Sequence, residues 1–241
     1  EWEERVIALI GLADLKDKRA VPVILKISGT LDPSDPQSEE RLIAVKEALA
    51  RFGCIPALTN TLVDPEVKFR GKVIAIEVIG ELGCIEAVPH LIALLDGDLR
   101  EVRRASILAL AAIRGDLALQ ELRKRIEDRD GHVRNAAITA LGQLGDKASF
   151  PVIMNHVERE NYQDVLEVSI RALLMIDAQS LFSRRDTLPP AIKEMIAHSA
   201  GSSEMLLTLS RDAEARVRMA ALAGLGRLRD ERVIGRLTEA L

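Results

Sequence analysis

The sequence predicts an all-α fold, an α-solenoid of about seven to eight antiparallel helix pairs, and three observations lead to it. Residues 140–151 repeat the spacing of apolar residues, glycines and proline found in residues 78–89, two repeats earlier. Within each repeat, apolar residues recur at three and four positions, the spacing of one helix face. Apolar residues make up 48% of the chain and aromatic residues only 2%, so aliphatic side chains must fill the core between stacked helices. A fixed period of about 31 residues is the signature of a solenoid.

The first helix of each unit is typified by residues 133–144. An apolar anchor late in this helix aligns the units, at Leu12, Leu49, Ile79, Leu110, Leu141, Leu173 and Leu225. An aspartate precedes the helix, where its side chain can accept from the free amides of the first turn, at Asp64, Asp98, Asp130 and Asp212. Gly83 and Gly145 follow the helix, and we expect left-handed C-caps there.

A proline opens the second helix of a unit, as Pro89 does for residues 89–95. Proline in the first helical position sacrifices no hydrogen bond. The same signal recurs at Pro22, Pro56 and Pro151. Together the two helices of each unit form an antiparallel pair.

Two stretches depart from the period. Residues 29–38 are rich in turn formers and predict an irregular exposed loop. Between residues 177 and 211 the pattern decays, which predicts a degenerate repeat. With these exceptions we expect a single solenoid over residues 1–241, in which each unit packs only on its neighbours. The chain begins without methionine and ends without a helix stop signal, so we also expect it to be a segment of a longer protein.

The charge and hydropathy of the chain exclude some classes of partner. The net charge is −4, whereas a surface that holds nucleic acid is expected to be basic. No apolar run approaches the length of a bilayer span, so we expect no membrane insertion.

The two cysteines, Cys54 and Cys84, lie in the same Gly-Cys-Ile turn of consecutive units. Stacked helical layers lie roughly 10 Å apart, beyond the reach of a disulfide. We therefore expect two small turn residues rather than a redox or zinc pair. Two cysteines are also too few for a disulfide framework and fit a reducing compartment, which predicts a cytoplasmic location.

The units resemble HEAT repeats, in the short bacterial and archaeal form first noted in phycobilisome lyases. The resemblance is carried by the Val-Arg pairs that end in Arg103, Arg134 and Arg218, by the alanine-rich stretch after each, by Leu-Gly-x-Leu at residues 141–144 and 225–228, and by the proline of the second helix. It covers nearly the whole chain and implies a right-handed superhelix. It implies little about function, because such arrays serve many roles.

A basic residue recurs at one slot of the first helix, at Lys72, Arg103, Arg134 and Arg218. A basic stripe of this kind can bind an anionic partner. The alternative, which the resemblance also implies and which we favour, is a structural ladder of hydrogen bonds and ion pairs between adjacent turns.

In this family the second helices line the concave side. Counted from the opening proline, the residues two and six places on are apolar, as are Leu91 and Leu95. The residues one, four and five places on should then point away from the core. This predicts a partner-binding strip that includes Lys26, Asn60, His90, Glu121, Lys124, Arg125, Asn155, His156 and Arg236. Its middle indicates a polar, partly basic groove for an acidic segment, and an ordinary solvated face is the alternative.

Patterns typical of catalysis are missing from the sequence. No histidine is followed by glutamate, and no two histidines have the spacing of a helical ligand pair, so we expect no metal. No nucleophile motif or glycine-rich phosphate loop occurs, so we expect neither catalytic residues nor a cofactor.

These observations predict a non-catalytic scaffold for protein–protein interaction, with a protein or peptide partner on the concave face. Two alternatives remain: a subunit of a bilin lyase-like enzyme, which the resemblance suggests, and a regulatory segment of a larger enzyme or transporter. A nucleic-acid role, as in HEAT-like DNA glycosylases, needs basic surface and aromatic side chains, and the only Trp and Tyr, Trp2 and Tyr162, lie far apart in the sequence.

Overall fold

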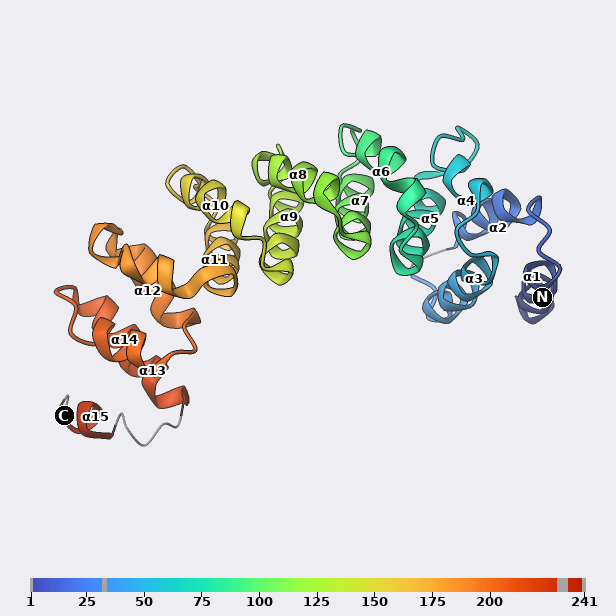
Figure 1. Ribbon diagram of the computed structural model, residues 1–241. Coiled ribbons are helices and arrows are strands. Elements are labelled where there is room, and N and C mark those ends of the chain that lie inside the picture. Colours follow the sequence, from blue (N-terminus) through green and yellow to red (C-terminus); the bar gives the residue numbers. More distant parts are fainter. Residues whose placement is uncertain (1, 32–33, 229–233, 240–241) are drawn as a thin grey trace. The chain divides into compact units, whose positions relative to one another are not determined.

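The computed structural model describes residues 2–31, 34–228 and 234–239, which form helices and turns without a strand (Figure 1). The chain divides into two compact units, residues 1–140 and 141–241. Each unit is a set of packed helices, so the predicted all-α class is confirmed.

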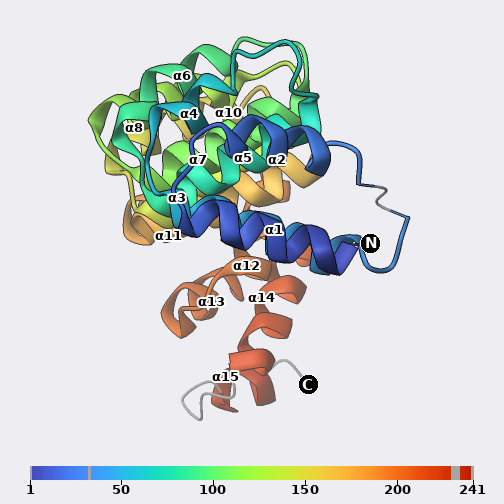
Figure 2. The same ribbon diagram turned by 90° about the vertical axis from the view of Figure 1, so that its right-hand side faces the viewer.

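Unit 1 contains four helix pairs followed by a first helix that continues into unit 2. The helices are α1 (Trp2–Asp14), α2 (Ala20–Ser28), α3 (Ser38–Phe52), α4 (Pro56–Asn60), α5 (Phe69–Leu82), α6 (Val88–Leu94), α7 (Arg100–Ile113), α8 (Asp116–Lys124) and α9 (Gly131–Leu144). Figure 2 shows α4, α6 and α8 as one layer above α5 and α7. Short 3-10 turns at Ile85–Ala87 and Arg125–Glu127 adjoin the second helices. Part of the expected loop at residues 29–38, residues 32–33, lies outside the described residues.

Unit 2 contains the remaining helices. They are α10 (Phe150–Val157), α11 (Gln163–Ser183), α12 (Pro190–Ser199), α13 (Ser203–Leu209), α14 (Ala215–Leu228) and α15 (Ile234–Glu239), with 3-10 turns at Lys147–Ser149 and Arg185–Thr187. Helices α12 and α13 occupy the stretch for which the sequence predicts a degenerate repeat.

The anchor residues that align the repeats form the centre of the core. Six of the seven have no solvent exposure, namely Leu49, Ile79, Leu110, Leu141, Leu173 and Leu225. Leu12 is the exception, with 36% exposure, and the buried apolar residues described in α1 are Leu9 and Ala13. Leu12 is therefore wrong as the anchor of the first repeat, because Leu9 and Ala13 form the buried face of α1 instead.

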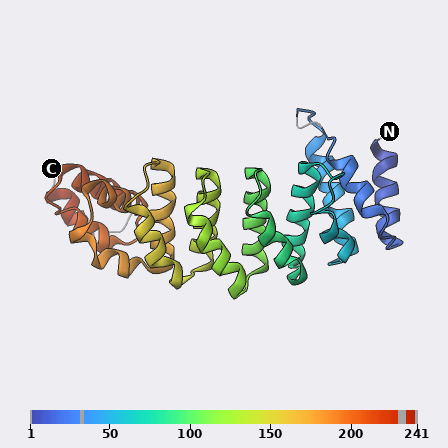
Figure 3. The ribbon, with the colours of Figure 1, turned by 90° about the horizontal axis from the view of Figure 1, so that it is seen from above.

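Consecutive first helices approach each other closely at a small residue, and Figure 3 shows two of them, α5 in teal and α7 in green, standing side by side. A Cβ placed on Gly80 of α5 would lie 2.8 Å from Ala109 Cα of α7. In unit 2, a Cβ on Gly142 would lie 2.8 Å from Ala172 Cβ of α11. Real Cβ atoms do not approach this closely, so glycine is required at both contacts.

The predicted left-handed turns after the first helices are confirmed. Gly83 has a φ of 66° and Gly145 a φ of 64°. In each turn the following amide donates back to the anchor, Cys84 N to Ile79 O and Asp146 N to Leu141 O, both at 3.1 Å. These bonds satisfy carbonyls at the helix end that would otherwise lack a donor.

The aspartates before the first helices serve the loops more than the helix ends. Asp64, Asp130 and Asp212 each accept from the backbone N–H two residues on, at 2.9 to 3.0 Å. Helix α5 begins at Phe69, well after Asp64. At Asp64 and Asp212 the carboxylate therefore shapes the turn that leads into the helix. Asp130 directly precedes α9 and accepts from the second residue of that helix, His132, which is the predicted cap.

The prediction that Cys54 and Cys84 stay unlinked is wrong, because the two residues form a disulfide with a Cα–Cα distance of 5.4 Å. The separation of helix axes does not apply here. Both cysteines lie in turns beyond the ends of α3 and α5, where the backbones of consecutive repeats come closer together than the helices do. The cysteine count therefore does not support a reducing compartment.

Helix α11 is kinked at Asp177, where the backbone leaves helical geometry with φ −160° and ψ 85°. The Asp177 carboxylate accepts from the Ser180 N–H at 2.9 Å and from the Ser180 hydroxyl at 2.7 Å. These bonds cap the segment after the kink. They also lower the pKa of Asp177 below its ordinary value of 3.8.

We predict that Gly80→Ala destabilises the protein by about 1–3 kcal/mol, because the added methyl group must push α7 away from α5. Gly11→Ala on α1 is the matched control, since nothing lies within 4 Å of a Cβ at that residue. Removing a helical glycine there should stabilise by about 0.4–1 kcal/mol. Urea denaturation measures both, and equal effects of the two substitutions would contradict close stacking.

The lowered pKa of Asp177 predicts a pH-dependent contribution to stability. A carboxyl group whose folded-state pKa is depressed stabilises the fold above its unfolded pKa, and this stabilisation is lost as the pH falls through the folded value. The melting temperature of Asp177→Asn should therefore lie below that of the wild type at pH 6, and the two should converge as the pH is lowered below the ordinary carboxyl range. A constant difference between the two proteins across that range would rule out the cap.

Candidate partner-binding surface

The second helices bury the positions that the sequence assigns to the core. Two and six places after the opening position, Leu91 and Leu95 of the α6 repeat have no exposure, and neither do Leu122 and Ile126 of the next repeat. These residues fix which way each second helix faces. The remaining positions determine what the surface offers a partner.

The residue four places after the opening position of a second helix is exposed wherever it is polar. Lys26 of α2, Asn60 of α4 and Lys124 of α8 are exposed in unit 1, and Asn155 of α10 is exposed in unit 2. The Lys124 side chain keeps 65% of its surface open and pairs with Glu121 at 2.6 Å. This position therefore presents polar groups to solvent in both units.

The position five places on is not exposed as predicted: it is buried in two repeats and half-buried at Arg125 and Arg236. Thr61 is 3% exposed and His156 4% exposed. Arg125 reaches back to the preceding second helix, where its guanidinium donates to Leu95 O at 3.4 Å and pairs with Asp96 at 2.9 Å. Leu95 directly follows the last residue of α6. The Arg125 side chain thus satisfies a helix end in the neighbouring layer rather than a partner.

Arg236 of α15 makes the same kind of contact in unit 2. Its Nη2 donates to Ser210 O at 2.6 Å and its Nε to the Ser210 hydroxyl at 2.9 Å. Ser210 is the C-cap of α13. Arg125 and Arg236 therefore stabilise the stacking of consecutive repeats. In the sequence, each is a cation that lies about one repeat after the end of a second helix.

Two further residues of the predicted strip are withdrawn from the surface. Glu121 is 9% exposed. The His156 imidazole lies 3.1 Å from the Glu160 carboxylate, and the two side chains are 4% and 5% exposed. Neither Glu121 nor His156 is available to a partner in this conformation.

His90 of α6 lies between these extremes. It is half-buried, and its Nδ1 is buried without a hydrogen-bond partner among the described residues. The covered nitrogen is closed to a partner in this conformation, so His90 offers only the exposed part of its ring to the surface. The polar residues that the second helices of unit 1 present at the surface are Lys26, Asn60, His90 and Lys124. We call this set the second-helix face.

The recurring arginine of the first helix holds the loop before its own helix. Arg103, Arg134 and Arg218 each donate through Nη1 to the carbonyl six residues earlier, at 2.9 Å in all three cases. Lys72, in the same slot of α5, is half-buried. This bond is local to each repeat.

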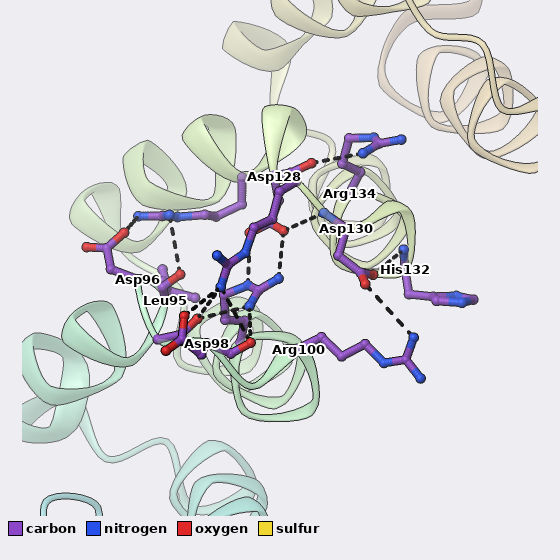
Figure 4. Close-up of polar contacts among 12 residues, drawn as sticks. Leu95, Asp96, Asp98, Arg100, Asp128, Asp130, His132 and Arg134 are labelled. Carbon is purple, nitrogen blue, oxygen red and sulfur yellow. Dashed lines mark hydrogen bonds and ion pairs between the residues drawn. The ribbon is translucent and has the colours of Figure 1, made fainter.

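Arg103 also binds the next repeat, through Asp128 (Figure 4). Its Nε and Nη2 donate to the two carboxylate oxygens of Asp128 at 3.1 and 3.0 Å. The two side chains are 3% and 5% exposed. Asp128 also accepts from the Asp130 N–H, and its backbone carbonyl accepts from Arg134. This aspartate therefore ties the loops of two consecutive repeats together.

The described residues, 2–31, 34–228 and 234–239, hold neither a metal-binding cluster nor a helix of membrane-spanning character. No cluster of three or more His, Cys, Asp or Glu side chains in those ranges has the arrangement of a metal site. None of the described helices combines the length and the apolar character needed to cross a bilayer.

The paired helices, glycine turns and arginine-held loops define an all-α protein built from stacked repeats. A family model described as HEAT repeats matches residues 55–130 and 88–174, and one described as PBS lyase HEAT-like repeat matches residues 217–241. The chain belongs to the HEAT-repeat family. No curated protein matches the sequence.

Solved structures similar to this chain share little sequence with it. The complex of CpcE and CpcF of phycocyanin lyase from Nostoc sp. PCC7120 is 18% identical over 89% of this chain and 93% of that chain, with a TM-score of 0.45. A designed armadillo repeat protein is 17% identical over 92% of this chain and 100% of its own, with a TM-score of 0.43. Computationally designed armadillo repeat proteins for modular peptide recognition are 19% identical over 94% and 99%, with a TM-score of 0.42.

We predict that Asp128→Ala destabilises the protein by about 3–5 kcal/mol, because it leaves the buried Arg103 guanidinium without its carboxylate. Asp98→Ala is the matched control. The Asp98 side chain is 98% exposed and pairs with Arg129 at the surface, so its loss should not measurably change stability. Chemical denaturation compares the two variants, and a mild effect of Asp128→Ala would show that the two loops are held by other contacts.

Proposed function

We propose that this chain is a non-catalytic scaffold that holds a protein or peptide partner along the second-helix face of unit 1. One observation carries the proposal. Successive second helices place a polar side chain at the surface, while the charged residues beside them are used in stacking. Lys26, Asn60 and Lys124 are exposed, and His90 is partly exposed.

The spacing of these residues suits an extended segment. Packed helices lie roughly 8–10 Å apart, and an extended chain advances about 3.3 Å per residue. One layer of the scaffold then corresponds to about three residues of the bound segment. Asn60 and His90 would then contact residues of the bound segment that are about three positions apart. Repeat arrays offer long surfaces that suit this mode of binding.

The charge of the face favours an acidic partner. Lys26 and Lys124 are its two cations, and Lys124 pairs with Glu121. Because the ammonium group is largely exposed, it can exchange this contact for a carboxylate of the partner at low desolvation cost. Electrostatic attraction of this kind adds mainly to the rate of association and to specificity.

A photo-crosslinking amino acid at position 60 tests the face directly. The same amino acid at position 104, an exposed position on α7, is the matched control on a first helix. We expect position 60 to capture a partner from the source cell extract, and position 104 to leave that partner uncaptured. Capture of the same protein with equal yield at both positions would argue against the second-helix face.

The captured partner then allows affinity to be measured. We predict that Lys26→Glu combined with Lys124→Glu weakens binding by roughly 5- to 30-fold, about 1–2 kcal/mol, because two exposed attractions become repulsions. Arg104→Glu changes the net charge in the same direction and should leave the affinity within about twofold. Titration calorimetry at two salt concentrations measures both, and an unchanged affinity of the double variant would reject the proposal.

A further inference from the structure

The disulfide between Cys54 and Cys84 joins equivalent turns of two consecutive repeats, 30 residues apart. Each cysteine follows a glycine in the left-handed region, Gly53 with φ 74° and Gly83 with φ 66°. The bond therefore spans the junction between α3 and α5. It belongs neither to the core nor to the second-helix face.

The two cysteine residues differ in exposure. Cys84 is 2% exposed, whereas Cys54 is exposed. A hollow of about 180 Å³ lies beside the bond and is lined in part by Pro56, Thr59 and Glu86. The hollow and the more exposed residue Cys54 define the side from which a thiolate can approach the bond, and Cys84 is then the leaving group.

The junction that the disulfide spans is less closely packed than the next one. Between α5 and α7 the backbones meet at Gly80 and Ala109. Helices α3 and α5 meet over a smaller area than α5 and α7 do. A hollow of about 250 Å³ lies beside α3 and α5, with Leu42, Phe69 and Val73 among its lining residues, and one of about 430 Å³ lies beside α5 and α7. Side chains beside an open cleft lack partner atoms on one side and lose dispersion energy.

The polar contact across the same junction is weak. Lys46 of α3 pairs with Glu77 of α5 at 2.6 Å, with side chains 25% and 38% exposed. Ion pairs that remain this accessible to water contribute little to stability. Among the described residues, the covalent bond is thus the strongest single restraint between α3 and α5. Helix α2 adds a second contact to α5, where a Cβ on Gly71 would lie 2.6 Å from Leu25 O.

We propose that Cys54–Cys84 is a thiol–disulfide exchange site, open to a small dithiol reductant, whose state determines how firmly the segment α1–α3 is held on the rest of unit 1. A thiolate of the dithiol attacks Cys54 Sγ, the protein S–S bond breaks, and Cys84 leaves as a thiolate that takes a proton from solvent. The second thiol of the reagent then attacks the mixed disulfide and releases Cys54. The protein gains two thiols, and the dithiol is oxidised to its own disulfide.

Reduction without denaturant tests the accessibility of the site. Protein kept under air should show no free thiol when it is unfolded in the presence of maleimide. Dithiothreitol added to the folded protein should then release two thiols, and removing it under air should close the bond again. Thiols that stay blocked until denaturant is added, or free thiols in the starting protein, would overturn the proposal.

The single variants test which sulfur is attacked. Cys84→Ser leaves Cys54, which should react with an aromatic disulfide reagent at least tenfold faster than Cys84 does in Cys54→Ser. Equal rates would show that the bond has no preferred side of attack.

Hydrogen exchange measured by mass spectrometry tests the consequence for the fold. Reduction should lower the protection of amides in α1–α3 by roughly 100- to 1,000-fold, the loss expected when a crosslink that closes a loop of this length is cut. Amides of α8 should keep their protection. The double variant Cys54→Ser, Cys84→Ser should match the reduced wild type and ignore dithiothreitol. Unchanged protection of α1–α3 in the reduced wild type would refute the role of the bond, whether or not the variant folds.

Discussion

The close approach of consecutive first helices is the constraint on which the rest of the structure depends. At Gly80 and Ala109 in unit 1, and at Gly142 and Ala172 in unit 2, there is no room for a further Cβ atom. Contact at this distance fixes the position of each layer against the next, so the anchor residues behind it are fully covered. The constant repeat length follows, because turns, prolines and loops must return to the same place in every layer.

Charged side chains serve this stacking more than they serve the surface. One set of arginines, typified by Arg134, holds the loop before its own helix. A second set, Arg125 and Arg236, satisfies the end of the preceding second helix. Both sets bind carbonyl groups that would otherwise be left without donors. The polar groups left for a partner are therefore fewer than the number of polar residues on the second helices suggests.

Sequence reasoning found the fold because periodicity within a helix reports directly on which face is buried. It located Ile79, Leu110 and the glycine turns correctly, and it missed contacts that form between layers. The stacking role of Arg125 depends on a helix end in the preceding repeat, which the pattern of its own helix does not reveal. The disulfide was missed for a related reason: helix spacing says nothing about how closely two turns approach. The partner remains open because its contacts lie outside the chain.

The covalent link between Cys54 and Cys84 also has a mechanical consequence. Its two ends are 30 residues apart in the sequence, and the enclosed loop, which includes α4 and α5, would add roughly 100 Å of contour length if it were drawn out. When the two termini of the oxidised chain are pulled apart, residues outside this loop can extend but residues within it cannot. The bond thus limits how far the chain can be extended, and reducing it raises that limit without any change of sequence.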